Sequence, residues 1–262
     1  MNFVSKTLGA LSLAILALTI TGGPANAVLV DFEEFFIRNH NPGGTITPPW
    51  DSDMGIVENA AGDGFSAWTP RSGQKVGYGT GLFDGMQLNQ LCTVDWDRTG
   101  GITTIVSYLN IWVTDGVNYA VISSEDDYRG TDFQTRDSWK IFEYSLGGFD
   151  WLFDSGTGGR SGSQYLTLNG SNATLADISD SVLVYAGPVG PTPGVGTGAP
   201  RAGYGFNLIW GDTQSNYTAQ QSLNNLSVTW KDGSGGMTTY EAGEVPEPAT
   251  MALIGSGLAA MA

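Results

Sequence analysis

The sequence contains very few of the residues on which most enzyme chemistry depends. Its 262 residues include one cysteine, Cys92, and one histidine, His40. A single cysteine excludes a disulfide within the chain, and one histidine with one cysteine cannot supply a zinc site of several such ligands. A serine-histidine-aspartate triad would have to use His40, which lies in a predicted loop. We expect His40 to be exposed and Cys92 to be a small buried residue.

Nucleotide-binding fingerprints and an excess of positive charge are also absent from the sequence. There is no glycine-rich loop ending in Lys-Ser or Lys-Thr, and no dinucleotide fingerprint leading into a helix. Lys and Arg number 11 against 26 Asp and Glu, a formal net charge of −15. Because so acidic a chain repels phosphate backbones, we expect no nucleic-acid partner.

Low charge and many turn-forming residues predict an all-β fold. Charged residues make up 14% of the chain and glycine occurs 38 times, which suits short strands joined by turns. We predict an antiparallel two-sheet β-sandwich, jelly-roll-like, over residues 28–244. Leu175–Ser181 could form one or two helical turns, and the Gly- and Pro-rich Ala186–Gly205 is expected to be a surface loop. The predicted strands are Val28–Phe32, Lys75–Tyr78, Ile102–Thr114, Val117–Ser123, Lys140–Leu146, Tyr165–Leu168, Leu183–Ala186, Gly205–Trp210, Asn225–Trp230 and Thr238–Glu241.

The clearest local pattern is a β-hairpin around Asp115-Gly116. This dipeptide predicts a two-residue type I′ turn, which would place Trp112 opposite Tyr119. Strand alternation then gives the hairpin two different faces. The face expected to point into the core carries Leu109, Ile111, Val113, Ala120 and Ile122. The other face carries Tyr108, Asn110, Trp112, Tyr119 and Val121.

The second face of this hairpin is a candidate glycan-binding surface. Sugar rings stack on aromatic planes, while amide groups hydrogen-bond the sugar hydroxyls. The candidate binding residues are Tyr108, Asn110, Trp112 and Tyr119. The alternative is that these aromatic side chains lie beneath a covering loop.

Clusters of acidic residues leave two further hypotheses open. Glu33 and Glu34 lie near the start, and Glu125–Asp127 follows the hairpin. A glycosidase needs two carboxylates flanking one bond, so a secreted carbohydrate-active hydrolase is the alternative to a non-catalytic protein. Asp51 and Asp53, or Glu125–Asp127, supply oxygens suited to calcium, although solvated loops would explain the same acids. No other cofactor is expected.

The N-terminal residues have the pattern of a secretory signal peptide. Lys6 provides the positive charge, Leu8–Ile20 forms an apolar segment, and Ala25 and Ala27 give the small-residue cleavage pattern. The apolar run is short for a membrane span. We therefore predict a signal helix over residues 1–27, recognised by the export machinery and removed after Ala27. The remaining chain has 10 basic and 26 acidic residues, a formal charge of −16.

A second processing signal is expected at the C-terminal side of the sandwich. Val245, Pro246, Glu247 and Pro248 are followed by the apolar run Ala249–Ala262. The prolines keep the junction extended, a shape suited to a protease. This run of 14 residues would span about 21 Å as a helix, less than the roughly 30 Å hydrocarbon core. This short apolar helix therefore suits a transient membrane tether that is later removed.

This C-terminal pattern resembles the PEP-CTERM sorting tails of Gram-negative bacteria. Those tails combine a Pro-Glu-Pro motif, an apolar helix and a terminal run of arginines. Val245–Thr250 matches the first part and Met251–Ala262 the second, whereas the sequence up to Ala262 does not include the arginines. Either further residues follow in the full chain, or the signal lacks its third part. The resemblance implies a sorting tail over 245–262 that exosortase, a membrane enzyme, recognises and cuts.

The resemblance also carries an expectation for the folded part of the chain. Substrates of exosortase often accompany exopolysaccharide production, and the stretches 109–116 and 204–213 are similar to jelly-roll proteins, many of which bind sugars. We therefore expect an exported, non-catalytic cell-surface or extracellular-matrix protein with polysaccharide as a partner.

Overall fold

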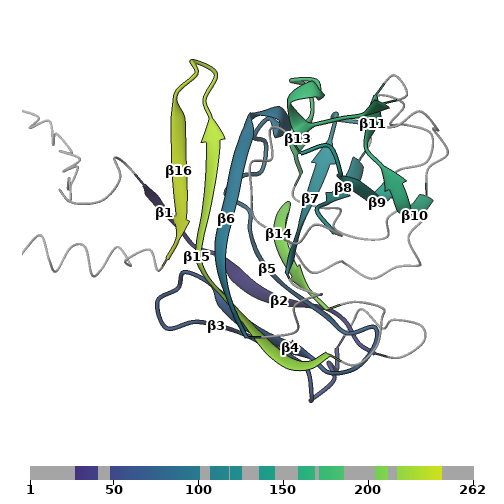
Figure 1. The fold of residues 1–262 in the computed structure, drawn as a ribbon, viewed down its shortest axis with the longest axis vertical. Helices are drawn as coiled ribbons and strands as arrows, with labels where there is room; N and C mark the ends of the chain where they lie inside the picture. The colour runs from purple at the N-terminus through teal and green to yellow at the C-terminus, as the bar shows by residue number, and fades with distance from the viewer. Residues whose placement is uncertain are drawn as a thin grey trace, which may run out of the picture.

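The computed structural model of this chain contains two large β-sheets (Figure 1). The predicted signal helix, apart from Ala27, lies outside the described residues, as do the whole sorting tail and positions 186–203 of the predicted long loop. Among the described residues, no helix has the length and apolar character needed to cross a membrane. The structure describes residues 27–40, 48–100, 107–117, 119–125, 136–144, 159–168, 171–185, 204–211 and 217–243.

The first sheet is organised around one long strand, β15. Its N-terminal half pairs with β4 and its C-terminal half with β16, while β6 runs along its other edge. Strand β3 extends the sheet beyond β4, and β1 extends it beyond β16. The bounds are β1 Val28–Val30, β3 Gly55–Glu58, β4 Phe65–Thr69, β6 Leu91–Gly100, β15 Tyr217–Lys231 and β16 Met237–Ala242.

The second sheet has the strand order β10-β9-β8-β7-β14-β5-β2, with β13 also pairing with β7. A separate ribbon pairs β11 (Thr167–Leu168) with β12 (Ser171–Asn172), and short 3₁₀ turns cover Leu88–Gln90 and Leu175–Asp177. The second sheet's bounds are β2 Glu33–Arg38, β5 Lys75–Thr80, β7 Tyr108–Thr114, β8 Tyr119–Ser123, β9 Lys140–Tyr144, β10 Gly159–Tyr165, β13 Leu183–Val184 and β14 Phe206–Trp210.

The core lies between the two sheets and is rich in aromatic rings. Phe65 of β4 packs against Tyr78 of β5, with ring centroids 5.2 Å apart. Phe83 contacts Phe206 of one sheet at 5.0 Å and Trp230 of the other at 5.5 Å. All five side chains are buried. Burial of this apolar surface from both layers is the main stabilising contribution, and it is consistent with the predicted all-β sandwich. The jelly-roll-like topology stays a prediction.

Three details of the predicted fold need correction. Strand β1 pairs with β16 in parallel, so the sheets are not wholly antiparallel. Helix at Leu175–Ser181 is limited to one 3₁₀ turn over Leu175–Asp177. Six strands were not predicted, namely β2, β3, β4, β6, β12 and, apart from Tyr165, β10. Strand β6 illustrates the reason, because Asp95 and Asp97 belong to a residue type that is depleted in strands, although they alternate with Val94 and Trp96.

The predicted hairpin exists, but its register differs from the prediction by two residues. Trp112 pairs with Val121 and not with Tyr119, and the connection covers residues 115–118. Side chains stabilise this longer turn, since the Gly116 N–H donates to Thr114 Oγ1 at 3.0 Å. A shift of two residues leaves each side chain on its face. The predicted core face is therefore confirmed, with Leu109, Ile111, Val113, Ala120 and Ile122 all buried.

Candidate functional site

The structure removes Tyr108 from the predicted glycan-binding surface. Its side chain is only 2% exposed, and Lys75 Nζ donates a hydrogen bond to its hydroxyl oxygen at 2.7 Å. Ile209 and Asn207, the β14 partners of Tyr108 and Asn110 on this face, are also buried. This part of the sheet is therefore covered, which was the alternative to a binding surface, and Tyr108 cannot contact a ligand.

An aromatic pair remains at the end of the hairpin. Trp112 and Tyr119 are both half-buried, and their ring centroids lie 5.9 Å apart with the planes tilted by 33°. Asn110 lies further along the strand, half-buried, opposite Asn207. Trp112 and Tyr119 therefore stay candidate binding residues, with half-buried Asn110 beside them and without Tyr108.

A better-formed site lies on the outer face of the first sheet. It is an open hollow of about 660 Å³ over strands β3, β4 and β15. The lining combines one aromatic ring with carboxylate, amide and hydroxyl groups, the mixture that sugar recognition needs. The lining residues are Asp53, Val57, Glu58, Ser66, Trp68, Pro70 and Gln220.

Trp68 is placed in this hollow by the alternation of strand β4. Phe65, Ala67 and Thr69 are buried towards the core, so Ser66 and Trp68 point to the outer face. Their half-buried state leaves part of each side chain accessible from the hollow.

Gly55 of the neighbouring strand makes room for the Trp68 indole. The two residues are cross-strand partners. A Cβ atom added to Gly55 would lie 2.1 Å from Trp68 Cζ2 and within 2.7 Å of two further atoms of the six-membered ring. The ring therefore covers the bare backbone of β3. Only glycine permits this close approach, and it gives the hollow an aromatic platform supported from below.

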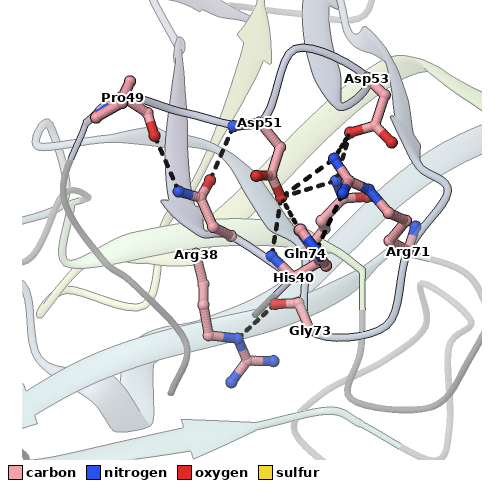
Figure 2. A network of polar contacts seen from close by, with 9 residues as sticks. Arg38, His40, Pro49, Asp51, Asp53, Arg71, Gly73 and Gln74 are labelled. Carbon is pink, nitrogen blue, oxygen red and sulfur yellow. Dashed lines mark hydrogen bonds and ion pairs between the residues drawn. The ribbon is translucent and has the colours of Figure 1, made fainter. Parts of the chain in front are cut away.

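A network of polar contacts fixes the end of the hollow where Asp53 lies (Figure 2). Arg71 Nη2 lies 2.5 Å from Asp53 Oδ1, and Gln74 Nε2 donates to the same oxygen at 2.8 Å. Gln74 Nε2 also donates to Asp51 Oδ2 at 3.1 Å. The segment before β3 is thus bound to the turn before β5, and the Asp53 carboxylate is held in one orientation.

Both carboxylates of this network are held in their ionised form. Burial alone would raise the pKa of Asp51, but hydrogen bonds from the His40 backbone N–H, the His40 ring and Gln74 outweigh it and lower the pKa to about 2. The hydrogen bond from Arg71 lowers the pKa of Asp53. Opposite charge and hydrogen bonding both favour a carboxylate over a carboxylic acid.

His40 takes part in this network and has no place for a nucleophile beside it. The side chain is 39% exposed, as predicted. His40 Nδ1 lies 2.7 Å from Asp51 Oδ2, and Arg71 Nη1 lies 3.0 Å from His40 Nε2. Because a guanidinium has only donors, Nε2 accepts and Nδ1 carries the proton. The position that a catalytic serine would occupy in a triad is filled by Arg71.

The candidate calcium loop uses its carboxylates in the same network. Asp51 and Asp53 face Arg71, His40 and Gln74 (Figure 2). The Arg71 guanidinium therefore binds the carboxylate oxygens that a calcium ion would need as ligands. In the part of the chain that the structure describes, no group of three or more His, Cys, Asp or Glu has a metal-binding arrangement. Of the other candidate, Glu125–Asp127, only Glu125 is described.

The other candidate residues, Glu33, Glu34 and Cys92, do not come together in a catalytic pair. Glu33 and Glu34 are successive residues of β2, so their side chains point to opposite faces and do not form a carboxylate pair. Glu33 Oε2 accepts a hydrogen bond from the Tyr204 hydroxyl. Cys92 is buried, as expected from the sequence.

Trp68 and Gly55 are not among the residues that the sequence patterns indicated. The alternation in Phe65–Thr69 could have indicated an outward tryptophan, and Gly55 begins a short apolar run. Nothing in the sequence indicates that the two residues face each other, because the loop between β3 and β4 sets their register.

Comparison with known proteins adds one finding. A family model described as the PEP-CTERM protein-sorting motif matches residues 244–262. No curated protein and no solved structure matches the chain. The match covers Val245, Pro246, Glu247 and Pro248, which all lie outside the described residues.

Proposed function

We propose that this chain, which carries a PEP-CTERM protein-sorting motif at residues 244–262 and is thereby exported and recognised by exosortase, uses its β-sandwich as a non-catalytic module that binds polysaccharide at the cell surface or in the extracellular space. A protein that is sorted to the surface needs a surface partner. The long polysaccharides outside a bacterial cell expose pyranose rings and hydroxyl groups, and the hollow on the first sheet offers groups that suit both.

The single observation that carries the proposal is the placement of Trp68 over Gly55. An indole ring that rests on bare backbone keeps a fixed plane, so a sugar ring can stack on it at little cost in side-chain entropy. Ser66 and Gln220 lie beside this platform in the same hollow, where they can exchange hydrogen bonds with sugar hydroxyls.

The acidic residues of the hollow favour binding over hydrolysis. Asp53 and Glu58 both line it, which is the observation that favours a hydrolase. A glycosidase, however, needs one carboxylic acid with a raised pKa to protonate the leaving group. Arg71 instead lowers the pKa of Asp53, and Glu58 Oε1 accepts the hydroxyl of buried Tyr78 at 2.6 Å. Neither acid has the surroundings of a proton donor.

Binding is tested with the full exported protein by affinity electrophoresis in gels that contain soluble polysaccharides. We expect Trp68→Ala to weaken binding about tenfold or more, the equivalent of losing ~1.4 kcal/mol. Trp112→Ala is the matched control, because it removes the half-buried indole of the other candidate surface. Loss of binding in Trp112→Ala with no change in Trp68→Ala would move the site to the hairpin.

Hydrolysis is tested on the same polysaccharides by measuring the release of reducing ends. We expect none above the level of the buffer. Hydrolysis by the wild-type protein that disappears in Glu58→Gln would establish the secreted hydrolase and contradict the non-catalytic proposal.

A further inference from the structure

We propose that the ligand is an uncharged polysaccharide that crosses the first sheet at right angles to its strands, stacking one ring on Trp68 and laying the following residues over β4, β15 and β6. This inference rests on the proposed function and adds to it the path and the chemical class of the ligand.

A row of outward residues defines the path. In the strand pairing, Val57 is the partner of Ser66, Ser66 of Ser222, and Ser222 of Thr99. Cross-strand partners point to the same face, so all four share the outer face with Trp68. Val57 is 53% exposed and Thr99 is exposed. The row therefore crosses β3, β4, β15 and β6, which are neighbours in this order in the first sheet (Figure 1).

The spacing and chemistry of this row suit a chain of sugar residues. Neighbouring strands lie about 4.7–4.9 Å apart, close to the length of one pyranose ring in an extended chain. Ser66 Oγ and Ser222 Oγ are 2.7 Å apart, so one hydroxyl donates to the other and the pair keeps a donor and acceptors for a ligand. Thr99 adds the next hydroxyl one strand further. Strands β4, β15 and β6 thus each present one hydroxyl to one sugar residue, while β3 presents the apolar side chain of Val57.

The charges around the row disfavour an acidic ligand. Asp53 and Glu58 line the hollow, Arg71 is paired with Asp53, and Asp97 is exposed two residues before Thr99. Arg98 is the partner of buried Leu223 and so lies on the opposite face. A polyuronate would bring carboxylates against carboxylates in a chain of net charge −15, which opposes its association. An uncharged chain avoids this repulsion and offers hydroxyl donors to the acids.

The test compares ligand class and ligand length. Titration of the full protein with cello-oligosaccharides of increasing length, galactomannan, dextran and alginate is followed by intrinsic fluorescence and calorimetry. We expect binding to at least one of the three uncharged series and none to alginate. Within the series that binds, we expect the affinity to rise at least tenfold from the disaccharide to the tetrasaccharide, because longer chains reach β15 and β6.

A pair of variants on β6 tests the path itself. Thr99→Val removes the hydroxyl of the row, and Thr93→Val removes an outward hydroxyl of the same strand outside the row, opposite Thr229. We expect Thr99→Val to weaken tetrasaccharide binding about fivefold, within the range for one hydrogen bond, and to leave disaccharide binding unchanged. Thr93→Val should change neither, and thermal unfolding checks that both variants fold.

The outcomes separate this inference from the proposed function. If Trp68→Ala abolishes binding but only alginate binds the wild type, the ligand class is wrong and the proposed function stands. If the affinity does not rise with oligosaccharide length and Thr99→Val does not change it, the proposed path over β15 and β6 is wrong. The role of Trp68 as a stacking platform is then unaffected. If no polysaccharide binds the wild-type protein, the proposed function fails and this inference fails with it.

Discussion

At the scale of single residues, the aromatic platform depends on the absence of a side chain at position 55. Gly55 has no side chain, and the indole of Trp68 occupies the space where a Cβ atom would be. The atoms that a Cβ would meet belong to the far end of a side chain and not to backbone. The fold can therefore accept a larger residue at position 55, but the aromatic platform cannot keep its place.

Gly55→Ala separates these two effects. We expect the variant to fold, with a small change in melting temperature, and to bind polysaccharide several-fold more weakly because the ring must leave the strand. Gly233→Ala is the matched control, since a Cβ there meets nothing within 4 Å. Binding by Gly55→Ala equal to that of the wild type would show that the position of the ring over β3 does not matter.

The burial of Tyr108 shows the limit of residue patterns. Alternation correctly placed Tyr108 on the face opposite the core, yet the side chain is buried beneath other parts of the chain and bonded to Lys75. Alternation reports which face of a strand a residue occupies. Whether that face meets solvent depends on the packing of distant segments, which no local pattern contains.

At the scale of elements, the polar network joins the segment before β3 to the turn before β5. Asn39 Nδ2 donates to the Pro49 carbonyl at 3.0 Å, and the Asp51 N–H donates to Asn39 Oδ1 at 3.0 Å. Together with the contacts of Asp51, Asp53 and Arg71, these bonds position one end of the hollow (Figure 2). The rigidity of this end depends on ionised carboxylates.

This dependence predicts a loss of stability in acid. The pKa of Asp51 is lowered from 3.8 to about 2 in the folded protein, so its stabilising contribution is complete above about pH 4. It is lost as the pH falls towards 2. We expect Asp51→Asn to be less stable than the wild type at neutral pH, and the difference to shrink between pH 4 and pH 2.

The measurement is urea unfolding of both proteins at several pH values, followed by tryptophan fluorescence. The comparison of the two proteins isolates Asp51 from other carboxylates with lowered pKa values, such as Asp177 and Asp232. A difference in stability that stays constant down to pH 2 would contradict the assigned role of Asp51.

The hairpin shows which part of an element the sequence can predict. Its two faces were correct because apolar alternation is a local property. Its register was wrong because Thr114 and Asp115 side chains accept the N–H groups of Gly116 and Val117, which stabilises a longer turn than Asp115-Gly116 alone predicts.

At the scale of the whole molecule, the acidic charge and the uncharged ligand lead to a prediction about salt. If stacking and hydrogen bonds to hydroxyls dominate binding, raising the salt from low concentration to about 1 M should change the affinity less than twofold, because salt screens only charge interactions. Titrations at several salt concentrations check this. A steep salt dependence would indicate a charged ligand group or a bridging cation.

The destination of this protein can be recognised in the amino-acid sequence alone. The Pro-Glu-Pro motif and its apolar run are short and contiguous, so they are recognised without the fold. The residue counts likewise exclude an intrachain disulfide and a zinc site of several histidine or cysteine ligands. The all-β class also followed from composition and alternation, which are local properties of the chain.

The candidate binding surface, in contrast, depends on contacts that only the folded chain makes. Trp68 meets Gly55 across two strands, and Ser66, Ser222 and Thr99 form one row although they lie far apart in the chain. Register between strands is set by turns and by the packing of both sheets, and these depend on contacts between distant residues. For the same reason the Tyr108 part of the hairpin face is covered, while β4, a strand that the sequence patterns did not reveal, carries Trp68 in the open hollow.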